Sequence, residues 1–170
     1  EAVAASGGVA IPDPSFAGSA FAALAFFALE EDYGFDFLRR LHDAGATQVG
    51  APGDVVTGVA EGQYAAGITL DFSARGAVEK GSPISIVWPA PGAIALYSPI
   101  GVTGEGDLPE RFVTYVLGSE AQSAIAGSGW QPVRPDVAWA AGGPQMTVEW
   151  SRAYHRQEEL LAAYREIFGG

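Results

Sequence analysis

Apolar and polar residues follow one another in blocks that predict short strands separated by helices. Residues 9–11 form a short apolar block that predicts a buried strand, and the almost continuous apolar run from Gly18 onward predicts a buried helix. Between the two, Pro12 and Pro14 make a rigid turn. Further strands are predicted at residues 47–49, 64–70 and 84–88, with another extended segment at 93–98.

Helical spacing accounts for most of the remaining chain. Asp54 is expected to cap one helix, and Asp107 with Glu110 and Ser119 with Gln122 have the spacing of capping boxes. The alternation of strands and helices predicts an α/β fold in which helices flank a central mixed sheet, followed by a mainly helical C-terminal segment. After the first helix, the predicted helices cover residues 35–41, 55–61, 72–80, 107–117, 119–125 and 151–168.

The last predicted helix carries a stripe of large apolar residues. Such a stripe is typical of a helix face that packs into a core, and much less typical of a cofactor site. The residues that share this face are Trp150, Tyr154, Leu161, Tyr164 and Phe168.

Composition places the chain among globular proteins. It has 170 residues, of which 48% are apolar and 17% charged, and its glycines and prolines lie between the periodic blocks. This length allows one sizeable domain or two small lobes. The longest apolar run is too short to cross a bilayer. The chain has no cysteine, which excludes disulfides, thiolate chemistry and cysteine metal sites.

The charge balance is strongly acidic. The net charge is −11, and Lys80 is the only lysine. Phosphate backbones and anionic membrane surfaces are recognised by clustered Lys and Arg, so nucleic acid is not an expected partner. A small anion is still a possible ligand, because charges farther away than about 8 Å are largely screened at physiological salt.

The turn that leads into the first helix is the main candidate binding site. Helix starts have amide groups without acceptors and a partial positive charge, and they bind anions. Gly18 and Ala20 allow a ligand to approach the backbone, and the hydroxyls of Ser15 and Ser19 can donate to it. The alternative is that one of these serines only caps the helix. Asp71, where the strand at 64–70 meets a helix, is likewise either a cap or a ligand-facing group.

Motifs of catalysis and of metal binding are missing from the sequence. His42 and His155 are the only histidines, and neither lies in a metal-binding or serine-hydrolase motif. Gly-rich nucleotide-binding loops are also missing. We therefore expect a protein that is not an enzyme and that uses no metal and no cofactor.

Five segments, taken together, resemble the periplasmic ferric-iron-binding family of ABC-importer solute-binding proteins. Each segment is a weak signal by itself, but all five occur in the family's order and spacing. The resemblance covers residues 8 to about 137 well and the final helix loosely. The segments are residues 11–20 (IPDPSFAGSA), 58–68 (GVAEGQYAAGI), 79–92 (EKGSPISIVWPAPG), 112–122 (FVTYVLGSEAQ) and 132–137 (PVRPDV).

The resemblance implies a two-lobed type 2 periplasmic-binding fold that closes over its ligand. In that family, the turn that matches Ser15, Gly18, Ser19 and Ala20 holds a phosphate or another anion. Members that bind bare ferric iron use two adjacent tyrosines, which align with Asp71 and Phe72 here. A phenylalanine cannot ligate iron. The expected ligand is therefore a small anionic or zwitterionic solute or a ferric complex, bound by these six residues.

The resemblance also implies a place in a larger assembly. Members deliver their solute to an ABC-importer membrane permease, and they are periplasmic or extracellular and membrane-associated. The first eight residues lack a signal peptide, and the family's first half-lobe has no counterpart, so we expect a fragment. Residues 8–90 are expected to form the second lobe. Residues 91–170 would normally belong to the first lobe, and are expected to pack on the second lobe, to pair with another copy of the chain, or to expose apolar surface.

One alternative function shares this fold. The same lobes serve as effector-sensing domains of transcription regulators, which would require a basic helix-turn-helix region upstream.

Overall fold

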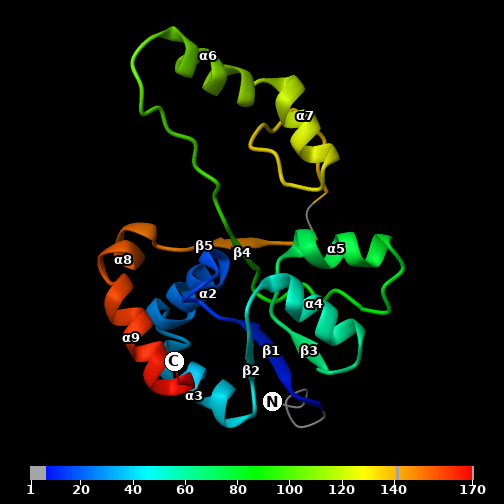
Figure 1. Cartoon of the computed structure of the whole chain (residues 1–170), viewed down its shortest axis with the longest axis vertical. Coiled ribbons are helices and arrows are strands. Elements are labelled where there is room, and N and C mark those ends of the chain that lie inside the picture. The colour runs from blue at the N-terminus through cyan, green and yellow to red at the C-terminus, as the bar shows by residue number, and fades with distance from the viewer. Residues whose placement is uncertain (1–6, 141, 170) are drawn as a thin grey trace. The chain divides into compact units, whose positions relative to one another are not determined.

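The structure is a computed structural model that describes residues 7–140 and 142–169, and it divides into two compact units (Figure 1). One unit comprises Glu1–Leu96 and Gln145–Gly170, and the other comprises Tyr97–Pro144. Residues 91–96 and most of the last 26 residues therefore share a unit with the predicted second lobe. The assignment of residues 8–90 and 91–170 to the two lobes of a larger protein stays a prediction.

The first unit is built on a small parallel sheet. Strand β1 (Val9–Pro12) lies in the centre, between β2 (Thr47–Val49) and β3 (Ala66–Gly67). Every strand pair that the described residues form is parallel, so the predicted mixed sheet is wrong. The reason is that helices connect these strands and return the chain to the same edge of the sheet, whereas antiparallel neighbours need only a hairpin.

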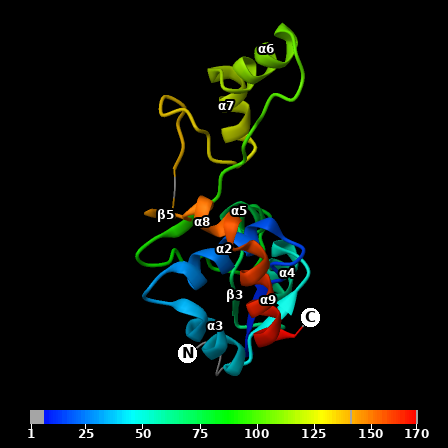
Figure 2. The same ribbon diagram turned by 90° about the vertical axis from the view of Figure 1, so that its left-hand side faces the viewer.

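Helices cover both faces of this sheet. Helix α4 (Pro52–Ala60) lies on one face with α5 (Asp71–Glu79) beside it, and Val55 of α4 packs close to Gly67 and Ala10. Helices α2 (Gly18–Leu29), α3 (Gly34–Asp43), α8 (Trp150–His155) and α9 (Gln157–Phe168) lie on the other face (Figures 1 and 2).

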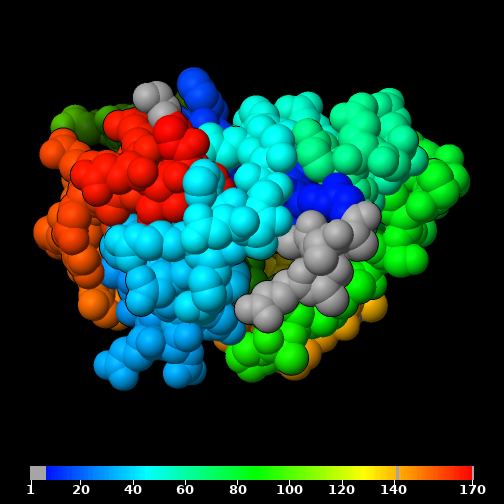
Figure 3. All heavy atoms as spheres, turned by 90° about the horizontal axis from the view of Figure 1, so that it is seen from below, coloured from blue at the N-terminus to red at the C-terminus, as the bar shows by residue number. Residues whose placement is uncertain are grey.

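The core of the first unit lies between β1 and helices α2, α3, α8 and α9. Ile11 faces this side, whereas its neighbour Ala10 faces α4, as the alternation of a strand requires. The C-terminal helix α9 packs against α3, and their atoms are in contact in Figure 3. Leu160 of α9 is fully buried. The end of the chain is thus part of this core, one of the three outcomes predicted for the C-terminal segment.

Two short strands and two more helices complete the chain. Strands β4 (Ala93–Ala95) and β5 (Gln145–Thr147) pair in parallel within the first unit. The second unit contains α6 (Asp107–Val116) and α7 (Ser119–Gly127). Its one buried polar side chain among the described residues is Gln122, which donates to the Val116 carbonyl at 2.8 Å and accepts from the Val133 amide at 2.7 Å.

Helix α6 has an exposed apolar stripe. Leu108, Phe112 and Tyr115 follow one another at helical spacing, and each is more than half exposed. Exposed apolar surface was another of the outcomes predicted for this segment. Pairing of two copies of the chain stays a prediction.

The exact helix starts differ from those predicted. Helix α4 begins at Pro52 with Ala51 as its N-cap, so Asp54 lies in the first turn and is not the N-cap, although its side chain accepts the Ala51 amide as the third residue of a capping box does. Gly106 and Gly118 precede α6 and α7, and neither predicted capping box is formed there. A backbone in extended or glycine geometry can start a helix without a side-chain cap, which sequence spacing does not reveal.

Two other predicted elements also differ. Residues 84–88 do not form a strand, although they alternate, and the prolines at 83 and 89 limit backbone pairing there. The last helix is divided at Arg156, which turns Trp150 and Tyr154 outward while Tyr164 stays buried.

Across the part of the chain that the structure describes, no helix combines the length and apolarity needed to cross a membrane.

Candidate functional site

Three helices begin at the same edge of the central sheet. Helix α2 follows β1, α4 follows β2 and α5 follows β3, and the three strands are parallel. The Asp13 amide donates to the Val49 carbonyl at 2.9 Å, which joins the β1–α2 turn to the end of β2. Thr69 Oγ1 donates to the Pro52 carbonyl at 2.7 Å, which joins the start of α5 to that of α4. Ligands of open α/β sheets bind at this carboxyl edge.

Two of these helices have an acidic residue in the first turn. In α4, Asp54 Oδ2 accepts the Ala51 amide at 2.9 Å. In α5, Asp71 Oδ2 accepts Arg75 Nε at 2.8 Å, within a half-buried ion pair. A carboxylate in the first turn of a helix satisfies part of its positive potential, which weakens the attraction for an external anion.

The start of α2 has no such occupant. Its N-cap is Ala17, no side chain caps it, and its first turn contains no acidic residue. Within residues 7–140 and 142–169, the amides of Gly18, Ser19 and Ala20 have no protein acceptor. A Cβ atom built on Gly18 would meet nothing within 4 Å, so the space beside this residue is open. Neither Ser15 nor Ser19 acts as a cap, so the capping alternative is wrong.

Asp13 fixes the turn that precedes these amides. Its backbone carbonyl accepts the amides of Phe16 and Ala17 at 3.3 and 3.0 Å, and its Oδ1 accepts the Ser15 amide at 2.7 Å. This is the hydrogen bonding of an Asx turn, which aspartate forms readily. The turn therefore holds Ser15 and the start of α2 in a defined position.

Two residues near this turn were not predicted as site residues. The ring of Phe16 is 82% exposed beside Ser15, so an apolar part of a solute could contact it. Tyr164 of α9 is buried below the turn. In the sequence, Tyr164 belongs to a helical stripe typical of a core face, and nothing in such a stripe indicates which helix start the residue will reach.

Tyr164 lines a small cavity beneath the turn. The cavity has a volume of about 40 Å³, and Pro12, Pro14 and Ala20 also line it. Burial, and to a lesser extent the negative charge of Asp13, raises the pKa of the Tyr164 hydroxyl above its ordinary value. The hydroxyl therefore stays protonated and remains a hydrogen-bond donor.

The predicted site residues are not all in one place. Ser15, Gly18, Ser19 and Ala20 lie together at the α2 start, and Asp71 lies at the same sheet edge but is paired with Arg75. Phe72 instead lines a groove of about 410 Å³ between α4 and α5.

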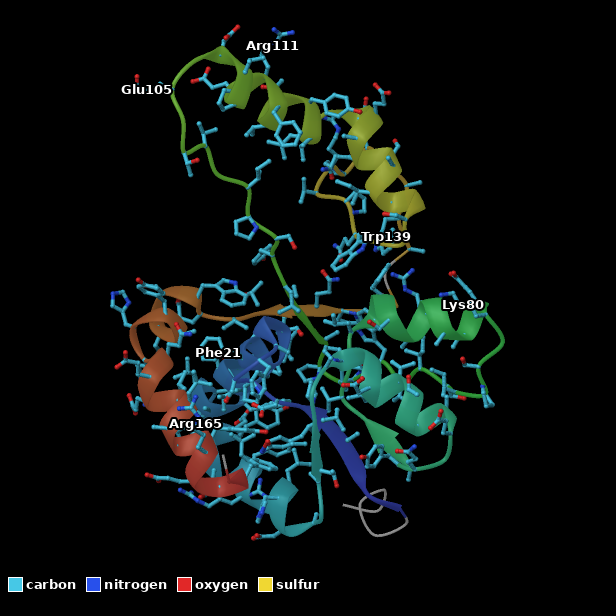
Figure 4. The ribbon with its side chains drawn as sticks, in the orientation of Figure 1. Phe21, Lys80, Glu105, Arg111, Trp139 and Arg165 are labelled. Carbon is cyan, nitrogen blue, oxygen red and sulfur yellow. The ribbon has the colours of Figure 1, made fainter. Side chains whose placement is uncertain are left out.

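The groove between α4 and α5 differs chemically from the α2 start. Thr57, Ser73, Gly76 and Lys80 contribute to its lining. Lys80 projects from the end of α5, where the helix carbonyls concentrate negative potential (Figure 4). This end of the groove is therefore a poor place for an anion, despite the lysine.

The described residues contain no metal cluster. No three of their His, Asp or Glu side chains come together in a group that could hold a metal ion.

Sequence comparison assigns the chain to a family. Residues 1–131 match the family model for bacterial extracellular solute-binding proteins. The chain belongs to this family.

Membership of the solute-binding family agrees with the mixed α/β architecture and with the open helix start. No curated protein matches the sequence. A solved structure described as "Two-component system protein mediate signal transduction" matches with a TM-score of 0.66 and 18% sequence identity. The match covers 91% of this chain and 57% of that one, so the chain spans little more than half of the similar structure. At this identity the likeness concerns the fold alone.

Proposed function

We propose that this chain is the extracytoplasmic solute-binding subunit of an ABC importer, or part of one, and that it captures a small anionic or zwitterionic solute or a ferric complex. The solute's negative group binds the amides of Gly18, Ser19 and Ala20. The observation that carries this proposal is a difference among three helix starts at one sheet edge: α4 and α5 each have an acidic residue in the first turn, whereas α2 has none and no side chain caps it.

The surroundings of the α2 start support this ligand class. Three amides and a helix dipole attract a carboxylate or phosphate group, and the exposed Phe16 ring offers contact to an apolar part of the solute. The ion pair of Asp71 and Arg75 lies in the helix that follows β3 at the same sheet edge, and we propose that it contacts the charged groups of a zwitterion. We further propose that the chain belongs to a two-lobed type 2 binding protein of the ferric-iron-binding kind, that the other lobe of that protein closes over this edge, and that a membrane permease receives the solute.

Ser19→Asp tests this site. The substitution places a carboxylate in the first turn of α2, where it competes with an external anion. Negative charge at a helix start stabilises by about 0.3–1 kcal/mol, so the ligand-free variant should melt no lower than the wild-type chain. The wild-type chain should be stabilised by a member of a panel of phosphate, phosphonates, small carboxylates, amino acids and ferric citrate, by about 2.7 kcal/mol at a hundredfold excess over Kd. Ser19→Asp should abolish that shift.

Two control variants accompany the thermal melts. Ser19→Ala keeps the backbone amides and should keep most of the shift, and Lys80→Gln removes the lysine of the α4–α5 groove and should leave the shift unchanged. A panel without any stabilising compound, or a shift that survives in Ser19→Asp, would contradict the proposal.

The effector-sensing alternative uses the same site and differs in the partner. In a domain of that kind, solute binding changes the activity of a DNA-binding or signalling partner. An importer subunit instead stimulates its permease when the solute is bound. We propose in either case that the solute is bound without being converted, because the sequence contains no recognised pair of nucleophile and base.

A further inference from the structure

Two buried side-chain groups of the first unit have no hydrogen-bond partner among the described residues, Gln48 Nε2 and the Tyr164 hydroxyl, and the second of them lies beside the α2 turn. Tyr164 is 3% exposed, and its hydroxyl has no partner among the residues that the structure describes. A buried polar group without a partner is costly, and such groups are uncommon in native proteins. The unpaired hydroxyl of Tyr164 is therefore expected to have a function that offsets the cost of burying it.

The hydroxyl lies near a possible acceptor. Pro12 and Pro14, which flank Asp13 in sequence, line the same small cavity as Tyr164. Asp13 Oδ1 accepts the Ser15 amide, but Asp13 Oδ2 accepts no hydrogen bond from residues 7–140 and 142–169. An unused donor thus lies beneath the turn that carries a carboxylate with an unused oxygen.

We propose that Tyr164 is a positioning residue for the α2 site: in the solute-bound protein its hydroxyl donates to the free carboxylate oxygen of Asp13 and fixes the turn at residues 13–17. This inference rests on the proposed function. It assigns to the C-terminal helix α9 a role in binding that neither the sequence pattern nor the family match gives.

The electrostatics of binding favour this contact in the bound state. A bound anion brings a second negative charge close to the Asp13 carboxylate, and like charges repel. A hydrogen bond from Tyr164 stabilises the carboxylate and reduces that repulsion, and bonds to charged acceptors are stronger than neutral ones. It also holds the Asx turn, and with it the Ser15 and Gly18 backbone, in the geometry that the anion needs.

Titration calorimetry with inorganic phosphate tests the inference on the intact chain. Tyr164→Phe removes only the hydroxyl and should weaken phosphate binding about tenfold, the size expected for one charge-assisted hydrogen bond. Asp13→Asn keeps an oxygen for the Ser15 amide but removes the second acceptor oxygen. In the Asp13→Asn background, Tyr164→Phe should cause no further loss of affinity.

A stability measurement separates positioning from simple packing. Ligand-free Tyr164→Phe should unfold at a urea concentration no lower than the wild-type chain, because it loses an unsatisfied group. Tyr154→Phe, at an exposed tyrosine of α8, is the matched control and should change neither affinity nor stability.

The possible outcomes distinguish the inference from the proposed function. If wild-type and Tyr164→Phe chains bind phosphate equally, or if the loss is equally large in the Asp13→Asn background, the inference is overturned and the α2 site stands. If the wild-type chain binds neither phosphate nor any other compound of the panel, both are overturned.

Discussion

Leu160→Ala should lower the free energy of unfolding of the first unit by about 2–5 kcal/mol. Leu160 is fully buried in α9, within the core that also contains Phe26 of α2, Leu38 of α3 and Ala153 of α8. Truncation of the leucine side chain removes buried apolar surface and leaves a cavity. Because α2, α3, α8 and α9 are closely packed around it, they cannot move enough to fill that cavity. Urea unfolding followed by circular dichroism measures the change.

The same substitution at an exposed leucine is the control for this prediction. Leu108 of α6 is 71% exposed, so Leu108→Ala should shift the unfolding midpoint only slightly. If the two variants unfold alike, α9 is not part of the core, and the position of Tyr164 beneath the α2 turn loses its support.

Gly67→Ala should destabilise the first unit by at least about 1–3 kcal/mol. Gly67 lies in β3 beside the central strand, and a Cβ atom there would overlap Val55 Cγ1 and lie 3.0 Å from the Ala10 carbonyl oxygen. Ala10 and Val55 are both buried, so neither can move without disturbing the layer between the sheet and α4. Thermal melting of the variant measures the loss.

A second glycine provides a control of opposite sign. Gly76 lies inside α5, and a Cβ atom there would meet nothing within 4 Å. Gly76→Ala should therefore stabilise the chain by about 0.5–1 kcal/mol, because alanine loses less conformational freedom in a helix. A Gly67→Ala variant as stable as Gly76→Ala would contradict the close packing of β3 against α4.

The elements with strong local signals could be predicted from sequence. The long apolar run of α2, the β1 strand before it and the short strand at 47–49 all occur where the pattern places them. The pattern of apolar and polar residues could not show which strands pair with one another. Residues 84–88 alternate like a strand, but whether a neighbouring strand offers them hydrogen bonds depends on the whole fold.

The candidate site was predictable in part for the same reason. The residues of the α2 start are adjacent in sequence, so a local pattern of glycine and serine after a proline turn marked them as candidates, and the family resemblance favoured an anion site over a simple cap. The ion pair of Asp71 with Arg75 is also local, at a spacing of four residues, but a choice between cap, ion pair and ligand contact needs coordinates. Tyr164 lies about 150 residues from Asp13 along the chain, and only the fold brings them together.

The most direct test of the α2 site is an amide nitrogen–proton NMR titration of the labelled chain with inorganic phosphate. The amides of Gly18, Ser19 and Ala20 should shift together and saturably, and their proton resonances should move downfield as each forms a hydrogen bond to the anion. Shifts confined to the α4–α5 groove around Lys80, or no saturable shift at residues 18–20, would contradict the account.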